Sequence, residues 1–571
     1  MLNGKGGILY QCTECPLKLK LKILIMRKLL IFVAAMFTTG SLLAGGLVTN
    51  TNQSAMYTRL QSRNASTAID AVYYNPAGLT KLGNGFYVSI NNQTIGQTQK
   101  ILNDYTYLSG KPKEYIGKVS APFFPGVYLA FNTGKLSFSA GVNPVGGGGG
   151  AKYDKGLPSF EMGIADIVPG LASQSIPTTQ YSADIFFEGS SIYLGYQANV
   201  AFKINDMFSV AAGVRLVSAA NTYKGHLRNI SINPNYPAFG AAYTGGMVLA
   251  SDFFTSGATT LNGLAASATS VATTLQPIAA GPNGSKLLAD PTNGVPAALV
   301  TAAQQLLGAA GLTPAQIGAA TVITAQGTLT GAAPVFTSKA TTMTANAAGT
   351  QNIEVDAEES GMGYTPILSL NFSPSEKLNI ALKYEFKTKL ELKTKVNDNK
   401  GGGVFVDGEK VIADMPAMFA VGVEYNPIDR LMVSASMNLY FDKKVDYDGS
   451  ETTNINMIDK NFTEYALGVE YGLTEKLRAS AGWLGTFTGA NANYQNDQRF
   501  EFNSNSFGAG FGYRINKMID INIGGQYAIY KEGTKDLTHM LGTFPITVKE
   551  TYNKNVWLVG VGLDFSFGKT E

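Results

Sequence analysis

The sequence predicts an all-β membrane protein: a 14-stranded antiparallel transmembrane β-barrel with an N-terminal hatch (plug) inside the lumen. The first observation is the composition, because 64 Gly, 28 Tyr and 30 Phe with only 15% charged residues are unusual for a soluble protein. The second is a series of short polar turns between alternating strands, and the third is a secretory signal that precedes them. The length of 571 residues alone would suggest several soluble domains.

The N-terminal region has the three parts of a secretory signal. Residues 26–44 hold a basic start, an apolar run and small residues before the expected cleavage after Ala44. We interpret residues 1–25 as an over-extended start. The two cysteines, Cys12 and Cys15, precede the cleavage site, so the exported chain is expected to lack cysteine, which suits an oxidising periplasm.

Residues 45–82 follow the signal and do not have the pattern of a strand. Ser66, Thr67 and Asp70 are residue types that cap helices, and Asn75-Pro76-Ala77 is typical of a turn. A compact, non-strand segment is therefore expected before the barrel, residues 83–571.

Six short turns give the strand count. They lie in the segments "VYLAFNTGKLSFSAG", "NVAFKINDMFSVAAG", "LSLNFSPSEKLNIALKY", "GVEYNPIDRLMVSASM", "GVEYGLTEKLRASAG" and "GYRINKMIDINIGG". One strand precedes the series at 85–95 and another ends the chain at 555–568. The total of fourteen is even and places both chain ends on one side, as bacterial outer-membrane barrels require. The connections at the other end are long, as extracellular loops are.

The strands alternate apolar and polar residues, which fits a lipid-facing wall or a half-buried sheet. Every even-numbered strand also ends in an aromatic residue on its apolar face: Phe131, Phe202, Phe372, Tyr425, Tyr471, Tyr513 and Phe567. We interpret these rings as the periplasmic girdle, at the depth where lipid meets headgroup. A soluble β-sandwich would scatter its aromatic residues in depth.

The opposite faces of the strands are rich in small residues. These are Gly422, Ala466, Gly468, Gly482, Gly508, Gly510 and Gly512. Missing side chains leave room for something packed against the wall, and fourteen strands enclose a lumen too wide for side chains alone to fill. Residues 45–82 have the size and chemistry to be the plug.

A cleaved signal, a short N-terminal segment that ends in Asn-Pro-Ala and a fourteen-stranded barrel resemble the FadL-type transporters, which carry long-chain fatty acids and other hydrophobic compounds. The resemblance implies a hatch whose signature turn is Asn75, Pro76 and Ala77. It also implies an extracellular apolar capture groove, a pocket against the hatch, and lateral release through a gap made by an inward kink in the third strand.

The third strand, 135–145, contains a break where this gap is expected. Pro144 cannot donate a ladder hydrogen bond, and the five glycines at 146–150 cannot hold a regular strand. The residues expected at the lateral opening are Gly141, Asn143, Pro144 and Gly146. The alternative is an ordinary strand end that runs into a flexible loop.

Two extracellular segments have unusual compositions. In the loop 150–187, an apolar helix face is expected from Phe160, Ile164, Ile167, Val168 and Leu171. It would form part of the capture groove or pack against neighbouring loops. An Ala/Thr/Gly-rich insert, about 251–350, is expected to form two short helices within mobile tracts. Surface decoration is preferred over a dedicated ligand lid.

The resulting hypothesis is passive uptake of hydrophobic small molecules, foremost long-chain fatty acids, driven by apolar burial worth about 0.8 kcal/mol per CH₂. A basic lumen residue should then pair with the carboxylate, the candidates being Arg59, Arg63, Arg215 and Lys383. The alternatives are a general diffusion porin for polar solutes and a surface antigen or adhesin barrel.

Other classes of function are disfavoured. No enzyme, cofactor or metal site is expected, since the two histidines, His226 and His539, stand far apart and outside any catalytic motif. The net charge of +3 is too small to indicate nucleic acid. We expect a monomer in the outer membrane of a Gram-negative bacterium, surrounded by lipid and lipopolysaccharide and inserted by the barrel-assembly machinery.

Overall fold

The computed structural model describes residues 47–398, 400, 403, 405–445 and 456–568. The predicted over-extended start, signal peptide and cleavage site lie outside the described residues. The chain forms two compact units. The barrel unit contains the chain up to Glu161, Ile185–His226 and the chain from Ile353 onward, and the helical unit contains Met162–Asp184 and Leu227–Asn352.

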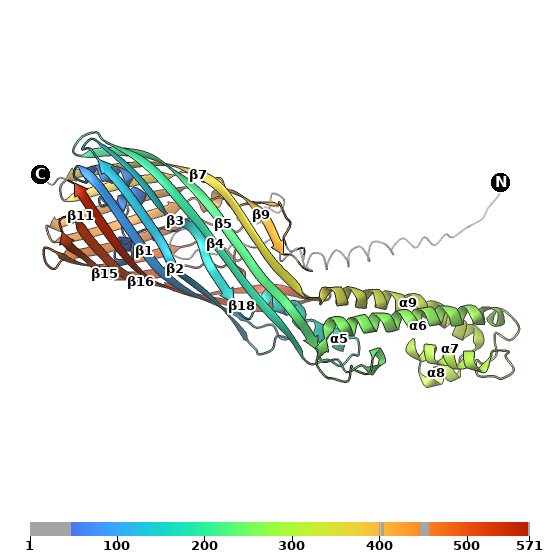
Figure 1. Ribbon diagram of the computed structural model, residues 1–571. Coiled ribbons are helices and arrows are strands. Elements are labelled where there is room, and N and C mark those ends of the chain that lie inside the picture. Colours follow the sequence, from blue (N-terminus) through green and yellow to red (C-terminus); the bar gives the residue numbers. More distant parts are fainter. Residues whose placement is uncertain (1–46, 399, 401–402, 404, 446–455, 569–571) are drawn as a thin grey trace, which may run out of the picture. The chain divides into compact units, whose positions relative to one another are not determined.

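Fourteen antiparallel strands form the closed barrel wall, as the sequence predicts (Figure 1). The wall strands are β1 (Gly85–Asn103), β2 (Lys113–Asn132), β3 (Leu136–Tyr153), β4 (Tyr181–Lys203), β5 (Phe208–Ile232), β7 (Ile353–Ser375), β8 (Leu378–Glu385), β11 (Met418–Ile428), β12 (Leu431–Tyr440), β13 (Phe462–Gly472), β14 (Leu477–Phe487), β15 (Ser504–Asn516), β16 (Ile519–Tyr530) and β18 (Phe544–Gly568). The barrel closes because β1 pairs with β18 along its whole length.

Four shorter strands extend this wall: β6 (Val248–Leu249), β9 (Glu391–Asp398), β10 (Lys410–Ile412) and β17 (Gly533–Leu541). β9 and β10 pair with each other, as β8 and β11 do. β17 pairs with the same strand, β18, that β16 does. These pieces continue the wall strands away from the end with the short turns.

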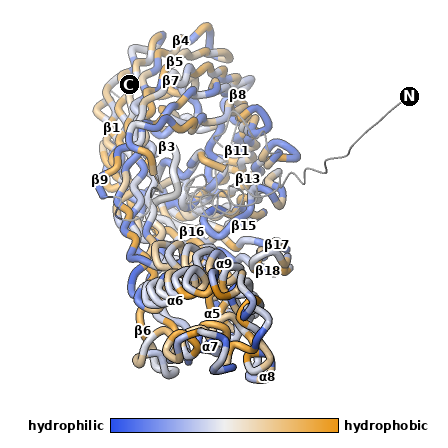
Figure 2. Tube along the Cα trace, turned by 90° about the vertical axis from the view of Figure 1, so that its right-hand side faces the viewer, coloured by the Kyte–Doolittle hydropathy of each residue, from blue (hydrophilic) through white to orange (hydrophobic). Residues whose placement is uncertain are grey.

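The apolar faces of the strands point outward. Along the wall strands, hydrophilic and hydrophobic residues alternate (Figure 2), as the period of two requires. Of the seven predicted girdle residues, six have exposed rings. Phe372 is only half-exposed, because its ring stacks on Phe208 at a centroid distance of 4.5 Å. An apolar outer face with rings at one end is what a lipid-embedded wall needs.

The N-terminal segment lies inside the barrel as short helices and turns: α2 (Ala55–Arg59), α3 (Ala71–Tyr74) and η1 (Pro76–Lys81). α2 contacts β1, β14, β15, β16 and β18, whereas α3 and η1 contact β2, β3 and β7 between them. Contacts with strands all around the wall place this segment, residues 47–82, in the lumen; we call it the hatch.

The helical unit contains α5 (Ile167–Ala172), η2 (Pro237–Phe239), α6 (Ala250–Ala279), α7 (Ala297–Ala309), α8 (Pro314–Gly318) and α9 (Val322–Gly349). The expected mobile tracts are instead two long helices, α6 and α9, packed against each other. Eight of the twelve buried residues of α6 follow one another in alternating steps of four and three: Phe254, Ala258, Leu261, Ala265, Ala268, Ala272, Leu275 and Ala279. This heptad spacing places the buried residues of α6 on one face, which packs against α9. Composition alone did not predict this packing. None of the described helices has the length and apolarity needed to cross a membrane.

Candidate functional site

The hatch fills the barrel lumen with polar side chains that are almost completely buried. Between Thr49 and Thr80, the buried polar residues include Asn50, Asn52, Gln53, Ser54, Arg59, Gln61, Arg63, Asn64, Asp70 and Asn75. Burying such groups is tolerable only where they find hydrogen-bond partners. The lumen face of the wall supplies many of these partners, so hatch and wall form one polar interface.

An ion pair within the hatch holds its two halves together. Arg63 donates to both carboxylate oxygens of Asp70, from Nε at 2.9 Å and from Nη2 at 2.8 Å. Ser54 and Ser66 also donate to this carboxylate, at 3.0 and 2.6 Å. Burial acts to raise the pKa of Asp70, but the Arg63 charge and these donors outweigh it and hold the pKa below its ordinary value. The side chain of Asp70 therefore forms an ion pair with Arg63 and makes no capping hydrogen bond to α3.

The predicted signature turn is fastened to the wall. Asn75 Nδ2 donates to Asn371 on β7 at 2.7 Å and to the carbonyl of Ser66 at 3.1 Å. The backbone N–H of Ala77 donates to Ser369 Oγ, and its carbonyl accepts from Ser209 Oγ, both at 2.8 Å. Pro76 starts η1, where its missing N–H costs nothing. The turn thus bonds to β5 and β7.

The hatch packs directly against glycines of the wall. A Cβ added to Gly508 would lie 2.5 Å from the Thr58 carbonyl oxygen, and one added to Gly422 would lie 2.5 Å from the Asn64 carbonyl carbon. Leu60 lies against Gly468 and Gln61 against Gly482 in the same way, and Arg59 lies close to both Gly510 and Gly512. These close approaches require residues without a side chain. All six are glycines that the sequence predicted to make room for a plug.

The ladder between β2 and β3 is interrupted. The two strands pair up to Val127–Val142 and resume only at Val119–Ala151. Through the interruption β3 continues as a strand and stays paired with β4, with register shifts on both sides of Gly146. The prediction that the third strand ends at 145 because the glycines at 146–150 cannot hold it is therefore wrong, since β4 supplies their ladder partners. Gly147 has φ +95°, a conformation that favours glycine. Of the predicted opening residues, Gly141 still pairs with β2, whereas Asn143, Pro144 and Gly146 lie in the interruption.

The freed edge of β3 bonds to the hatch instead, an arrangement that we call the latch. Thr49 and Gly146 form an antiparallel bridge. Asn50 donates its N–H to Val145 O at 2.8 Å, Gly147 donates to Val48 O at 3.2 Å, and Gln53 Nε2 donates to Pro144 O at 2.8 Å. The facing stretch of β2 carries Phe123, a residue that is 80% exposed. The backbone groups of β3 that leave the wall are thus satisfied inside the lumen.

Each of the four predicted basic residues is buried and has a protein partner. Arg59 pairs with Glu470 and donates to Ser480 Oγ at 2.7 Å, and Arg63 pairs with Asp70. Arg215 and Lys383 share one carboxylate, that of Glu385, at 2.7 and 2.8 Å. Both cations also lie over the ring of Tyr73 in the hatch, at 4.9 and 4.4 Å from its centroid.

The predicted capture residues fall on two short helices rather than on one. Phe160 belongs to the barrel unit, in α4 (Pro158–Ala165), where its ring packs edge-on against Phe187 at 5.8 Å. The other four lie in the helical unit: Ile164 and Leu171 are buried, and Ile167 and Val168 are half-exposed. The helix is interrupted at Asp166. Their role in capture stays a prediction.

Sequence reasoning missed the loop between β14 and β15, residues 488–503, which is largely buried. Its Tyr494 joins an apolar cluster with Leu47, Met457, Ile458 and Phe462, among others. Its Glu501 pairs with Lys554 at 2.6 Å, where both side chains are buried. The segment "NANYQNDQRFEF" is polar and resembles any surface loop, so composition offered no signal. Pro122 and Pro125 on β2, in contrast, could have predicted the interruption of the ladder, because proline cannot donate a ladder hydrogen bond.

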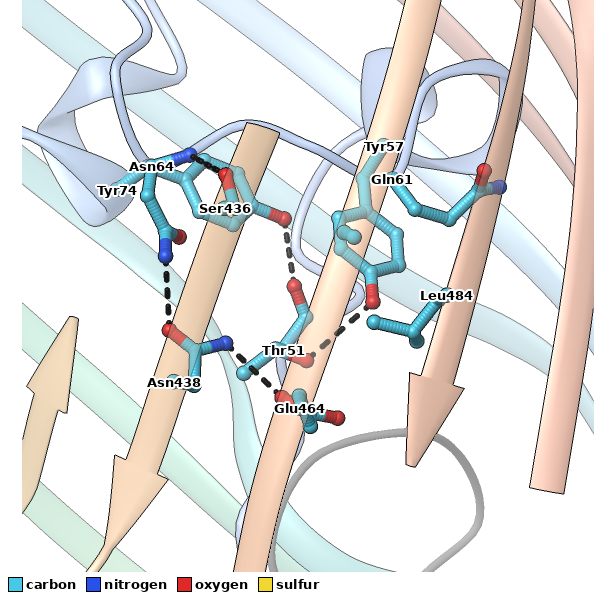
Figure 3. Close-up of a pocket in the computed structure, with 10 residues that line it drawn as sticks. Thr51, Tyr57, Gln61, Asn64, Tyr74, Ser436, Asn438, Glu464 and Leu484 are labelled. Carbon is cyan, nitrogen blue, oxygen red and sulfur yellow. Dashed lines mark hydrogen bonds between the residues drawn. The ribbon is translucent and has the colours of Figure 1, made fainter. Parts of the chain in front are cut away.

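A small cavity remains between hatch and wall (Figure 3). Thr51, Tyr57, Gln61, Asn64 and Tyr74 line it from the hatch, and Ser436, Asn438, Glu464, Ala466 and Leu484 line it from the wall. Its volume of about 10 Å³ admits about one water-sized molecule. No group of three or more His, Cys, Asp or Glu side chains within the described ranges is arranged to hold a metal ion.

Comparison with known proteins agrees with this geometry. The family model of the outer membrane protein transport proteins (OMPP1/FadL/TodX) matches residues 262–567, more than half of the chain. The chain belongs to this family. It is therefore an outer-membrane channel for hydrophobic compounds and not an enzyme.

The fold also occurs in a solved structure. A Pseudomonas aeruginosa FadL homologue matches with a TM-score of 0.55 and 13% identity, covering 92% of this chain and 100% of its own. The P. putida toluene transporter TodX matches with a TM-score of 0.45 and 12% identity, covering 88% of this chain and 95% of its own. The comparison with curated proteins gives no match.

Proposed function

We propose that this channel takes up long-chain fatty acids and releases them sideways between β2 and β3. Ligands are captured at the extracellular loops, pass to a pocket against the hatch and leave through the interrupted ladder. The observation that carries the proposal is the latch, in which the inturned part of β3, residues 144–147, bonds to hatch residues 48–53 and not to β2.

A lateral route suits an apolar ligand physically. A polar, hydrogen-bonded hatch fills the lumen, and a hydrocarbon chain that crossed it would desolvate those groups without replacing their bonds. The interruption instead faces lipid on its outer side, where Phe123 is exposed. An acyl chain that moves sideways into lipid gains apolar surroundings, worth about 0.8 kcal/mol per CH₂.

The charge balance beside Tyr73 favours an anionic headgroup. Arg215 and Lys383 contribute two positive charges, and Glu385 contributes one negative charge. Arg63, in contrast, is matched by Asp70. Arg59 is matched by Glu470, and Arg478, which also approaches Glu470, has a closer partner in Asp520. A buried excess of one cation is costly unless an anion joins it. We therefore assign the fatty-acid carboxylate to Arg215 and Lys383.

A reversible crosslink tests the lateral route. Thr49 and Gly146 form a non-hydrogen-bonded antiparallel pair, whose Cα atoms approach to about 4.5 Å, within reach of a disulfide. Cells that depend on a Thr49→Cys/Gly146→Cys protein should lose oleate uptake when oxidised and regain it with reductant. The two single-cysteine variants are the controls. Gly146→Cys alone crowds the hatch as much as the double variant does, but it cannot form the crosslink. Equal uptake by the oxidised and reduced double variant would refute release at this latch.

The headgroup assignment has a separate test. Lys383→Met removes the surplus charge and leaves the Arg215–Glu385 pair balanced, so the barrel should fold normally. Oleate uptake should fall about tenfold, as expected for the loss of a charged hydrogen bond. Uptake of toluene, which has no charge, should stay unchanged. An equal fall for both compounds would show a general defect, and no fall for either would exclude the carboxylate role.

A further inference from the structure

A carboxylate without a counter-charge faces the cavity between hatch and wall. Glu464 on β13 is 1% exposed, and its Oε1 has no hydrogen-bond partner among the described residues. None of the ion pairs in the described part of the chain includes it. An isolated buried carboxylate is costly, and proteins bury such groups mainly where they are paired or bind a cation.

The wall holds this carboxylate in one orientation. Oε2 accepts from Asn438 Nδ2 at 2.9 Å and from the hydroxyl of Tyr440 at 2.7 Å. Both donors bind the same oxygen, so Oε1 is left without a donor. Glu464 lines the cavity together with Tyr57 and Leu484 (Figure 3). Carboxylates that ligate cations are oriented by hydrogen bonds of this kind.

The other polar groups around the cavity are also hard ligands. The hydroxyls of Thr51 and Tyr57 lie 3.4 Å apart, a long separation for a hydrogen bond, and Ser436 contributes a third hydroxyl. The cavity lining includes neither sulfur nor imidazole. Oxygen ligands suit alkali and alkaline-earth cations. One carboxylate matches a single positive charge, whereas a divalent ion gathers several carboxylates.

We propose that this cavity binds one alkali cation, sodium or potassium, between Glu464 of the wall and the hydroxyls of Thr51 and Tyr57 of the hatch. The ion neutralises the buried carboxylate and joins two parts of the chain that are far apart in sequence. It thereby stabilises the hatch in the closed barrel. The site goes beyond the proposed function, since it requires no hydrophobic ligand.

Sodium-23 NMR tests the site directly. The full-length protein in detergent is titrated with sodium chloride against N-methyl-D-glucamine chloride at constant ionic strength, and the sodium linewidth is followed. We expect saturable broadening that Glu464→Gln abolishes. Tyr57→Phe keeps the ring and should raise the half-saturating sodium concentration about tenfold. Glu424→Gln is the matched control, because Glu424 is not among the residues that line the cavity.

The outcomes distinguish a bound cation from water or a proton in the cavity. Broadening that does not saturate, or that Glu464→Gln retains, means that the cavity holds only water or a proton and overturns the proposal. If Glu464→Gln does not fold, Tyr57→Phe decides, and an unchanged half-saturation overturns the proposal as well. The measurement uses no hydrophobic substrate, so its result is independent of the uptake experiments.

Discussion

Replacing Asp70 with asparagine should loosen the hatch and leave the barrel intact. Asp70 accepts two bonds from Arg63 and one each from Ser54 and Ser66. The asparagine has no charge, so the guanidinium of Arg63 would be buried without a counterion. No strand of the wall takes part in these bonds, and the damage is therefore confined to the hatch.

The expected magnitude follows from the burial of both partners. The side chains of Arg63 and Asp70 are 6% and 2% exposed. Removing one partner of such a pair costs about 3–5 kcal/mol, which shifts the equilibrium between the seated and the displaced hatch by about 10²- to 10⁴-fold. Replacing both partners with apolar residues of similar volume is often close to neutral. Arg63→Met/Asp70→Leu should therefore keep the hatch seated much better than Asp70→Asn does.

Single-channel recording in planar bilayers measures this difference. The wild-type protein should show little steady conductance, Asp70→Asn should show frequent large openings, and Arg63→Met/Asp70→Leu should resemble the wild type. Unchanged thermal unfolding of the barrel serves as the control for folding. The reasoning is refuted if Asp70→Asn stays closed, or if the double variant leaks as much as the single one. A steady large conductance of the wild type would instead indicate a porin.

Three further predictions concern the hatch and the insert. Gly422→Ala places a methyl group against the hatch backbone and should raise the conductance, whereas Gly525→Ala, whose nearest neighbour lies 3.8 Å away, should not; equal conductances would contradict this packing. Because the pKa of Asp70 lies below its ordinary value of 3.8, its ion pair contributes fully above that pH and is lost as the pH falls through the lowered pKa. Openings should thus increase only below about pH 3.8, and an onset near neutral pH would contradict the assignment. Deleting residues 255–345 should leave oleate uptake intact at equal protein levels; its loss would favour a ligand lid or an adhesin role for the insert.

The residues of the barrel wall were predictable because their pattern is local. Alternation within a strand, a polar turn and an aromatic residue at the strand end all lie within about fifteen residues of sequence. Such patterns gave the correct number of strands and the outward orientation of their apolar faces. Even Gly422 and Gly508 could be recognised as room for a plug, because a glycine on the lumen face of a strand lets another backbone approach closely.

The partners within the site were not predictable, because the tertiary fold decides them. Arg59 meets Glu470, and Thr49 meets Gly146, across long stretches of chain that carry no common pattern. For the same reason the sequence singled out Arg215 and Lys383 only as basic residues, while the structure shows that they share one carboxylate. The tracts of the helical unit that were expected to be mobile form long helices instead. Heptad packing between α6 and α9 outweighs the low helix propensity of their Thr and Gly residues.

The sequence by itself thus determined that the chain is a plugged barrel, and Pro144 and Gly146 marked the part of the third strand where its ladder with β2 is interrupted. The alternation of apolar and polar residues, the residue types of the turns and the glycines of the wall are all visible within a few residues of sequence. Only the tertiary structure decided that β3 bonds to the hatch where it leaves β2, and that Glu464 faces a cavity without a counter-charge. Those features depend on which groups closure of the barrel brings together, and no short segment of the chain records that.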